Sequence, residues 1–315
     1  MKTIVTALLL SAATMLPAQA QFALDSRFAD EDGDLIADVP TDEGEHVDPD
    51  TLIFTYTPVE DPAVYADVWQ GFMDHLAEAT GKDVEFFPVQ SNAAQLEAMR
   101  AGRLHIAGFN TGSNPIAVAC AGFRPFAMMA ANDGSFGYEM EIIVPAGSDA
   151  QEIEDLRGGE IAFTQETSNS GFKAPSAILS SEFDMVANED FTPAFSGSHD
   201  TSILGVANGD YEAAAIANSV MTRMVEREVV DADQIRSIYQ SATFPTTGYG
   251  TVYNLTPDLQ EQIREAFFSF DWEGSTLAEE FNASGEEQFI EISFEEDWEV
   301  IRQIDDANGV SYTCQ

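Results

Sequence analysis

The sequence predicts an α/β protein of two lobes with a ligand cleft between them. From residue 51 onward, short apolar runs alternate with amphipathic stretches, which is the pattern of βαβ units in a parallel sheet. The alternation pauses at a Gly-containing turn, 134–137, and then starts again, so two sheets are expected. A chain of 315 residues is long enough for two such lobes.

The first twenty residues have the features of a secretory signal peptide. Lys2 gives the positive start, residues 4–10 are apolar, and Ala18-Gln19-Ala20 is a small-x-small cleavage site. We expect cleavage before Gln21. No other stretch is apolar over the length of a membrane span, and no Cys follows the cleavage site, so the sequence predicts a soluble periplasmic protein without a lipid anchor.

Residues 21–50 are predicted to form an acidic, solvated arm that leads into the folded body, because they are rich in Asp and Glu and lack apolar periodicity. Within the arm, Asp30-Glu31-Asp32-Gly33-Asp34 places carboxylates at alternating positions around a Gly turn, with Asp38 beyond. This resembles part of a calcium-binding loop, but the bidentate Glu that closes an EF-hand is missing. A calcium site and a plain acidic loop both remain open.

The first lobe is predicted from residues 51–137 together with 247–315. A helix over 62–80 carries its aromatic and aliphatic side chains on one side and ends at Gly81. The other elements alternate regularly: strands are expected at 52–57, 84–89, 104–109 and 125–130, and further helices at 93–101, 115–121 and after Pro257. Two successive βαβ units predict a parallel sheet covered on both faces.

The second lobe is predicted over residues 138–246. Its strands are expected at 139–144, 160–163, 191–195, 211–217 and 235–239, and its helices at 150–156, 171–181, 201–208 and 220–229. The Thr- and Gly-rich stretch 244–253 carries the chain back to the first lobe. Two lobes joined by two crossings form a cleft, which is where small-ligand sites preferentially lie.

The charge of the chain excludes several partners. With 55 Asp and Glu against 13 Lys and Arg, the formal net charge is −42. Such a surface repels the phosphates of nucleic acids and anionic lipids. We therefore expect neither as a partner.

The two cysteines, Cys120 and Cys314, are expected to pair in an oxidising compartment and to fix the C-terminal tail. The alternative is two separate thiols. Two cysteines so far apart have no metal-ligand spacing, so we expect no zinc site; apart from the open question of calcium in the arm, we expect neither a metal nor a cofactor.

A search for catalytic motifs is negative. The sequence contains no Walker A motif, no Gly-x-Gly-x-x-Gly after the first strand, no His-Glu-x-x-His and no Gly-x-Ser-x-Gly elbow. Ser198-His199-Asp200 has the residue types of a catalytic triad, but consecutive residues do not supply its geometry. The prediction is a non-enzymatic protein, and a hydrolase or transferase acting in the cleft is the less favoured alternative.

A better signal lies between the predicted strand that ends at Phe163 and the following helix. Ser168, Asn169 and Ser170 occupy the cap and first turn of that helix, where free backbone N–H groups and the helix dipole attract an anion. Plain N-capping is the alternative, and it needs only one such residue.

Three sequence blocks in succession resemble the phosphonate- and phosphite-binding proteins of ABC importers. The blocks are Gly134-Ser-Phe-Gly-Tyr138, Ser168-Asn-Ser-Gly-Phe172, and Gly197-Ser-His-Asp200 followed by Ala207-Asn208. Their order and spacing match from about residue 51 to 255, which is about two thirds of the chain. The resemblance implies a type II periplasmic binding protein, which closes as a hinged clamp on a phosphorus oxyanion and delivers it to a membrane permease.

The resemblance also implies ligand contacts. Tyr138 matches a ligand-binding tyrosine, Ser168 and Ser170 match two hydroxyl donors, and Asn169 stands where Thr is usual. His199 matches a ligand-contacting histidine, although it could instead cap the helix from Thr201.

Other positions depart from the family pattern. Ser91 or Asn92 stands near another family tyrosine. Ser219 and Thr247 occupy the positions where members that bind aminoethylphosphonate carry two acids for the amine. Glu60 or Asp200 could take over that role from new positions. Phosphite, phosphate or a small alkylphosphonate is therefore favoured, and an aminophosphonate stays open.

The sequence thus predicts a monomeric periplasmic solute-binding protein that captures a small phosphorus oxyanion in the cleft and delivers it to an ABC transporter permease. A binder of another small anion, such as a sulfonate, is the alternative within the same class.

Overall fold

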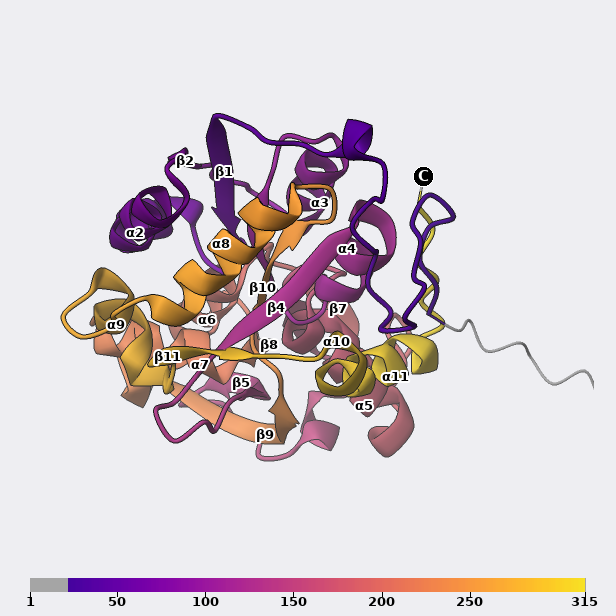
Figure 1. Ribbon diagram of the computed structural model, residues 1–315. Helices are drawn as coiled ribbons and strands as arrows, with labels where there is room; N and C mark the ends of the chain where they lie inside the picture. Colours follow the sequence, from indigo (N-terminus) through magenta and orange to yellow (C-terminus); the bar gives the residue numbers. More distant parts are fainter. Residues whose placement is uncertain (1–21, 315) are drawn as a thin grey trace, which may run out of the picture.

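The computed structural model describes residues 22–314 and contains two mixed β-sheets surrounded by helices (Figure 1). In this view the strands β1 and β2 of the first sheet lie at the top, and β5 and β9 of the second sheet lie at the bottom. The predicted signal peptide falls outside the described residues. Within residues 22–314, none of the helices is both long and apolar enough to traverse a bilayer.

The first sheet has six strands in the order β11-β4-β10-β3-β1-β2. Their bounds are β1 (Thr51–Tyr56), β2 (Asp83–Phe86), β3 (Ile106–Phe109), β4 (Phe123–Ala130), β10 (Gly248–Val252) and β11 (Gln288–Glu291). β1 pairs in parallel with β2 and β3, as predicted. β10 instead lies antiparallel between β3 and β4, and β11 is antiparallel to β4, so the prediction of a parallel sheet is wrong in this half. β3 and β4 are joined by a helix and run in the same direction, and β10, which returns from the second sheet, is inserted between them in the opposite direction.

Helices on both faces of the first sheet enclose an aromatic core around Phe54, Trp69, Phe72 and Tyr249. The helix predicted over 62–80 consists of three pieces, a 3₁₀ turn that ends at Val64 and two α-helices that are separated at Trp69. The helical elements here are η2 (Pro62–Val64), α1 (Tyr65–Val68), α2 (Gln70–Thr80), α3 (Asn92–Arg100), α4 (Asn114–Ala121), α8 (Pro257–Ser269), α9 (Thr276–Phe281), η6 (Asn282–Ser284), α10 (Phe294–Asp297) and α11 (Glu299–Ala307).

The second sheet has five strands in the order β7-β6-β8-β5-β9. Their bounds are β5 (Tyr138–Pro145), β6 (Glu160–Phe163), β7 (Thr192–Phe195), β8 (Ala213–Ala217) and β9 (Ile235–Phe244). β6 is parallel to β7 and β8, whereas β5 is antiparallel to β8 and β9. The helical elements are η3 (Ile153–Leu156), η4 (Asn169–Lys173), α5 (Ala174–Phe183), α6 (His199–Asn208), α7 (Asn218–Glu226) and η5 (Ala232–Gln234). The helix predicted over 150–156 is only the 3₁₀ turn η3.

Two segments connect the sheets, 131–137 between β4 and β5 and 245–247 between β9 and β10. The first segment passes close to the end of β9 at Gly137, where an added Cβ would lie 2.1 Å from Cγ2 of Thr243. Gly137 also has a φ of +118°, which favours glycine. The strands of the first sheet fall within residues 51–137 and 247–315, and those of the second sheet fall within 138–246. The lobe boundaries themselves stay a prediction.

The N-terminal arm packs along the folded body, and within residues 22–50 only Ala37 is buried. Figure 1 shows the indigo arm beside the yellow C-terminal segment. The Phe22 ring lies 5.4 Å from that of Phe294, and the Phe28 ring lies 4.9 Å from that of Tyr253. A few aromatic contacts therefore attach a mostly exposed or half-buried acidic segment to the folded body.

The acidic loop of the arm gathers the carboxylates of Asp30, Asp32 and Asp34, whose oxygens lie within 4.8 Å of one another. Oδ1 of Asp30 accepts a hydrogen bond from the backbone N–H of Gly33 at 2.9 Å, and Oδ1 of Asp34 accepts one from Ile36 N–H at 2.8 Å, as in an Asx turn. These local bonds explain the loop conformation, and calcium binding at the loop stays a hypothesis.

The disulfide between Cys120 and Cys314 is present, which confirms that prediction. It joins α4 to the C-terminal tail, and the two Cα atoms lie 5.1 Å apart.

Candidate functional site

A cavity of about 40 Å³ lies between the two sheets and is lined from both sides. Tyr56, at the end of β1, contributes to one wall, and α7 and the start of η4 contribute to the other. One water needs roughly 10–15 Å³ when cavity volume is measured in this way. The cavity therefore has room for a few non-hydrogen atoms, which is the size of a small oxyanion.

Seven of the ten residues predicted for ligand binding line this cavity. They are Tyr138, Ser168, Asn169, Ser170, His199, Ser219 and Thr247. They come from β5, η4, α6, α7 and the returning segment before β10, which lie far apart in the sequence. The fold brings these segments together, because the ends of neighbouring strands and the helix starts that follow them meet at one edge of a sheet.

The other three predicted residues lie outside the cavity. Asp200, in the first turn of α6, accepts hydrogen bonds from the backbone N–H groups of Asp61 and Thr201. Ser91 caps α3 by accepting a hydrogen bond from Ala94 N–H at 3.1 Å. Both side chains are thus engaged in local backbone contacts.

Asn92 connects the first sheet to the loop before η4. Its Nδ2 donates to Oγ1 of Thr167 at 2.8 Å, its backbone N–H donates to Oε1 of Gln165 at 3.1 Å, and its Oδ1 accepts from Thr57 at 3.3 Å. Asn92 therefore holds the loop that precedes Ser168 and does not itself line the cavity.

The start of η4 presents small donors to the cavity. Ser168 is the N-cap, and its Oγ accepts a hydrogen bond from Gly171 N–H at 3.1 Å. The Ser170 hydroxyl is buried and has no hydrogen-bond partner within residues 22–314. The loop of the first sheet approaches closely here, because a Cβ on Gly112 would lie 2.4 Å from the backbone nitrogen of Asn169.

Asn169 and Tyr138 form a second pair of polar groups. Nδ2 of Asn169 donates to the Tyr138 hydroxyl at 3.3 Å, and Oδ1 of Asn169 is buried without a partner among the described residues. Both the tyrosine hydroxyl and this amide oxygen can therefore still bind a ligand or a water.

The protonation of His199 follows from its surroundings. Nδ1 of His199 accepts a hydrogen bond from Ala217 N–H at 3.1 Å, so in the neutral ring Nε2 carries the proton. Nε2 lies 3.5 Å from Oγ of Ser168, on the cavity side. Burial lowers the pKa of His199 to about 4, although Asp200 raises it slightly. His199 is thus a neutral N–H donor at neutral pH.

Arg223 is a cavity residue that the sequence analysis missed. It lies on α7, one turn after Ser219, and it is buried with 3% exposure. An i, i+4 spacing on a helix places two side chains on the same face, and this is the signal that could have found it. Burial disfavours its charge, but the surrounding tyrosines and glutamates outweigh this effect, so the pKa of Arg223 is raised well above its usual value.

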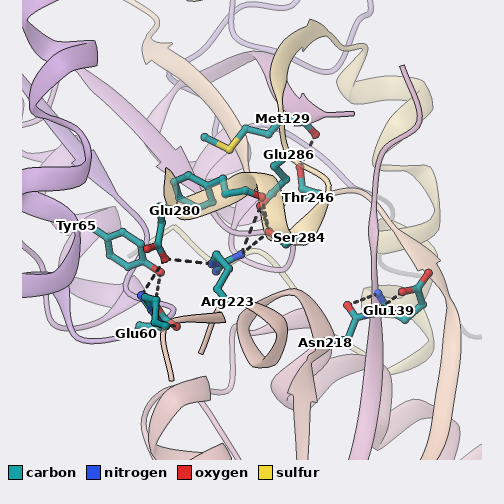
Figure 2. Close-up of polar contacts among 12 residues, drawn as sticks. Glu60, Tyr65, Met129, Glu139, Asn218, Arg223, Thr246, Glu280, Ser284 and Glu286 are labelled. Carbon is teal, nitrogen blue, oxygen red and sulfur yellow. Dashed lines mark hydrogen bonds and ion pairs between the residues drawn. The ribbon is translucent and has the colours of Figure 1, made fainter. Parts of the chain in front are cut away.

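A network of ion pairs surrounds Arg223 (Figure 2). Its Nη1 donates to Oγ of Ser284 at 3.2 Å and to Oε2 of Glu286 at 3.4 Å, and its Nε lies 3.5 Å from Oε1 of Glu280. Arg227, at the end of α7, contacts Glu280 at 2.9 Å and Glu60 at 2.7 Å. The network fastens α7 to segments that belong to the first sheet. Of the glutamates in this network, Glu286 lines the cavity.

Residues 54–298 match the family described as the periplasmic substrate-binding protein of phosphonate ABC transporters. A phosphate-import protein, PhnD, of Mycolicibacterium smegmatis is 25% identical over 283 residues, which cover 84% of this chain and 85% of that protein. A phosphonates-binding periplasmic protein of Escherichia coli is 24% identical over 206 residues, or 64% of this chain and 61% of its own length.

Two solved structures share the fold. A binding protein of a phosphonate transporter from Pseudomonas aeruginosa has a TM-score of 0.74 at 21% identity, over 82% of this chain and 86% of its own. PhnD1 from Prochlorococcus marinus, in complex with methylphosphonate, has a TM-score of 0.73 at 16% identity, over 83% and 99% of the two chains. The predicted two-lobed α/β fold is confirmed. With most of its length matching one family, this chain belongs to the periplasmic substrate-binding proteins of phosphonate ABC transporters.

Proposed function

We propose that this protein binds phosphate, phosphite or a small alkylphosphonate in the cavity between its sheets and delivers it, as a monomer, to the permease of an ABC importer. The observation that carries the proposal is the convergence of hydrogen-bond donors on one small cavity. The hydroxyls of Ser168 and Ser170, Nε2–H of His199 and the guanidinium of Arg223 come from three different segments, and all four residues line it.

The donors suit an anion for a physical reason. A phosphorus oxyanion offers only acceptor oxygens apart from any P–OH group, and each oxygen can accept from neutral hydroxyl or imidazole donors without a change of net charge. The net charge of −42 does not prevent this, because charges separated by more than about 10 Å are screened at 0.1 M salt. Local donors therefore decide the affinity.

Neither of the two carboxylates considered for an ammonium group, Glu60 and Asp200, is available in the cavity, and Glu286, which does line it, is paired with Arg223. Glu60 is engaged by Arg227 and by the Tyr65 hydroxyl, which donates to it at 2.8 Å, and Asp200 lies outside the cavity. Ser219 and Thr247 line the cavity without charge. We therefore propose that ligands without an amine bind more tightly than aminoethylphosphonate. The names of the two curated relatives, one a phosphate importer and one a phosphonate binder, fit this range.

The cavity geometry does not favour the hydrolase alternative. The Ser198 hydroxyl donates to Asp200 and not to His199, and Nδ1 of His199 accepts from a backbone N–H where a triad histidine would donate to a carboxylate. A binding protein returns its ligand unchanged. Recovery of intact methylphosphonate after long incubation would agree with this, and release of phosphate would contradict it.

Calorimetric titration with phosphate, phosphite, methylphosphonate, aminoethylphosphonate and methanesulfonate tests the ligand class. Replacing Ser168 or Ser170 by Ala removes one hydrogen bond to a charged ligand, which is worth roughly 1.5 to 3 kcal/mol, or about a ten- to hundredfold loss of affinity. Preferred binding of methanesulfonate by the wild type would point instead to a sulfonate binder.

Ser275→Ala is the matched control, because Ser275 also caps a helix, accepting from Ala278 N–H at 3.1 Å, but does not line the cavity. This variant should lose about 1 kcal/mol of stability and keep the wild-type affinity. If Ser168→Ala and Ser170→Ala behave in the same way as Ser275→Ala, the helix start is not part of the binding site.

A further inference from the structure

We infer that Glu286 is a specificity-determining residue that makes the cavity select oxyanions bound together with one proton. The inference rests on the proposed function and narrows its ligand class. Phosphate and phosphonates can carry a P–OH group near neutral pH, whereas sulfate and sulfonates cannot. None of the sequence blocks that resemble the family contains Glu286, which comes from the segment between η6 and β11.

The contacts of Glu286 leave one of its oxygens for the cavity. Its side chain is buried, and Oε2 accepts hydrogen bonds from the Ser284 hydroxyl at 3.0 Å and from Nη1 of Arg223 at 3.4 Å. Oε1 has no hydrogen-bond partner within residues 22–314, and Glu286 lines the cavity. A ligand that fills the cavity must therefore meet a carboxylate oxygen.

Arg223 adds a donor beside this acceptor. Its Nη1 is used by Ser284 and Glu286, whereas Nη2 has no hydrogen-bond partner in the described part of the chain. The pair thus places one hydrogen-bond acceptor, Oε1 of Glu286, and one donor, Nη2 of Arg223, on the same side of the cavity. A tetrahedral oxyanion matches both when one oxygen accepts from Arg223 and a protonated oxygen donates to Glu286.

The chemistry requires one proton between Glu286 and the ligand. A carboxylate and an ionised oxyanion in contact repel each other, and a single shared proton converts that contact into a short, charge-assisted hydrogen bond. The proton arrives either on the ligand or on the carboxyl group, and the bound state is the same. The second ionisation of a phosphate group lies near pH 6 in phosphorylated side chains, so phosphorus ligands supply this proton near neutrality.

The tyrosines and His199 near Glu286 do not change their charge in the same range, whereas burial raises the pKa of Glu280, and the variant Glu280→Gln below controls for that group. Arg223 on α7, Glu280 on α9, Tyr56 on β1 and Tyr249 on β10 surround it, with His199 on α6 across the cavity. Burial raises the pKa values of both tyrosines, and it lowers that of His199 to about 4. Burial also raises the pKa of Glu286, in the direction that helps it to keep a proton.

Calorimetry of the full protein with methylphosphonate, phosphate and sulfate tests this between pH 6.5 and 9.5. Above the second ionisation of the ligand, binding has to take up one proton, so the dissociation constant should rise about tenfold per pH unit. Titration in two buffers of different ionisation enthalpy should show an uptake that approaches one proton. The wild type should bind sulfate at least a hundredfold more weakly than phosphate.

Glu286→Gln should abolish the selection, because a glutamine amide can donate an N–H to an ionised oxygen at the same place. The variant should lose the pH slope and gain at least tenfold in sulfate affinity. Glu280→Gln is the matched control: Glu280 also pairs with Arg223 and is also buried, but it does not line the cavity, so the wild-type slope should persist.

Proton uptake by the wild-type protein can be measured even if Glu286→Gln fails to fold. Binding of methylphosphonate without proton uptake, or an unchanged slope in Glu286→Gln, would overturn the role of Glu286 and leave the proposed function standing. Failure of every phosphorus ligand to bind the wild type would overturn the proposed function itself, and the present inference with it.

Discussion

The ammonium group of Lys173 lies 2.8 Å from Oδ1 of Asp305, and both side chains are almost wholly buried. Lys173 ends η4, the segment that begins at the cavity, whereas Asp305 belongs to the C-terminal helix α11. Nζ of Lys173 also donates to the Gly112 carbonyl at 2.7 Å, and the Tyr312 hydroxyl donates to Asp305. The pair therefore ties the donor-bearing helix of the second sheet to the first sheet and to the C-terminal segment.

Breaking this pair from one side should be costly. Asp305→Asn or Lys173→Met leaves a buried group without its charged partner, and we expect a loss of about 3 to 5 kcal/mol in unfolding free energy. The double variant Lys173→Met/Asp305→Leu should recover much of that loss. Asp48→Asn, which breaks an exposed pair with Lys82 of 2.6 Å, is the control and should cost at most about 1 kcal/mol. Denaturant melts measure all four variants, and equal losses in the buried and exposed pairs would contradict the expectation.

His199 should make the protein less stable in acid. Its pKa is lowered to about 4 in the folded state and returns to its usual 6.5 on unfolding, so the unfolded chain binds more protons between these values. This contribution to stability is complete above pH 6.5 and decreases by up to about 3 kcal/mol as the pH falls to 4. Urea melts of the wild type and of His199→Gln over this range should differ in slope, with the variant less sensitive to pH.

The same pKa predicts how His199 affects ligand binding. Because the ring stays neutral and donates from Nε2, its contribution to affinity should not change between pH 5.5 and 7. His199→Gln keeps an N–H donor and His199→Ala does not, so only the Ala variant should lose about tenfold or more in affinity. A wild-type affinity that falls as the pH rises through the histidine range, and does not fall in His199→Gln, would indicate a charged His199.

The Cys120–Cys314 disulfide should affect stability and not affinity. It closes a loop of 194 residues in sequence separation, for which the chain-entropy estimate is about 5 kcal/mol. Neither cysteine lines the cavity. The double variant Cys120→Ala/Cys314→Ala should unfold at lower denaturant concentration and bind methylphosphonate within a factor of about three of the wild type. A tenfold loss of affinity would show that the tail also shapes the site.

Ligand binding should bring the two sheets together about the segments 131–137 and 245–247. A cavity enclosed from both sides can admit an ion only if the sheets move apart, and hinge closure is a common way to do so. X-ray scattering should show a smaller radius of gyration with saturating ligand. An unchanged radius would contradict the clamp.

Local patterns predicted most of the elements and several site residues. The alternation of apolar runs and helical stretches located β1, β6 and α4 to within a residue or two, because short-range periodicity specifies which face of each element is buried. Ser168 and Ser170 could be proposed because a helix start leaves N–H groups free whatever surrounds it. The contact of Asp200 with the backbone of Asp61, outside the cavity, could not be predicted in this way, because the two residues are far apart in the sequence.

The sequence by itself determined the family, the alternation of strands and helices, and the donor-rich helix start, since each depends on residues near in sequence. Only the tertiary structure decided that β10 lies antiparallel between β3 and β4, that Ala217 N–H sets the tautomer of His199, and that Arg223 and Glu286 share one wall. Those relationships join residues far apart in the chain, such as Thr251 and Ile106 in the pairing of β10 with β3, and local periodicity carries no information about which distant segments meet when the chain packs.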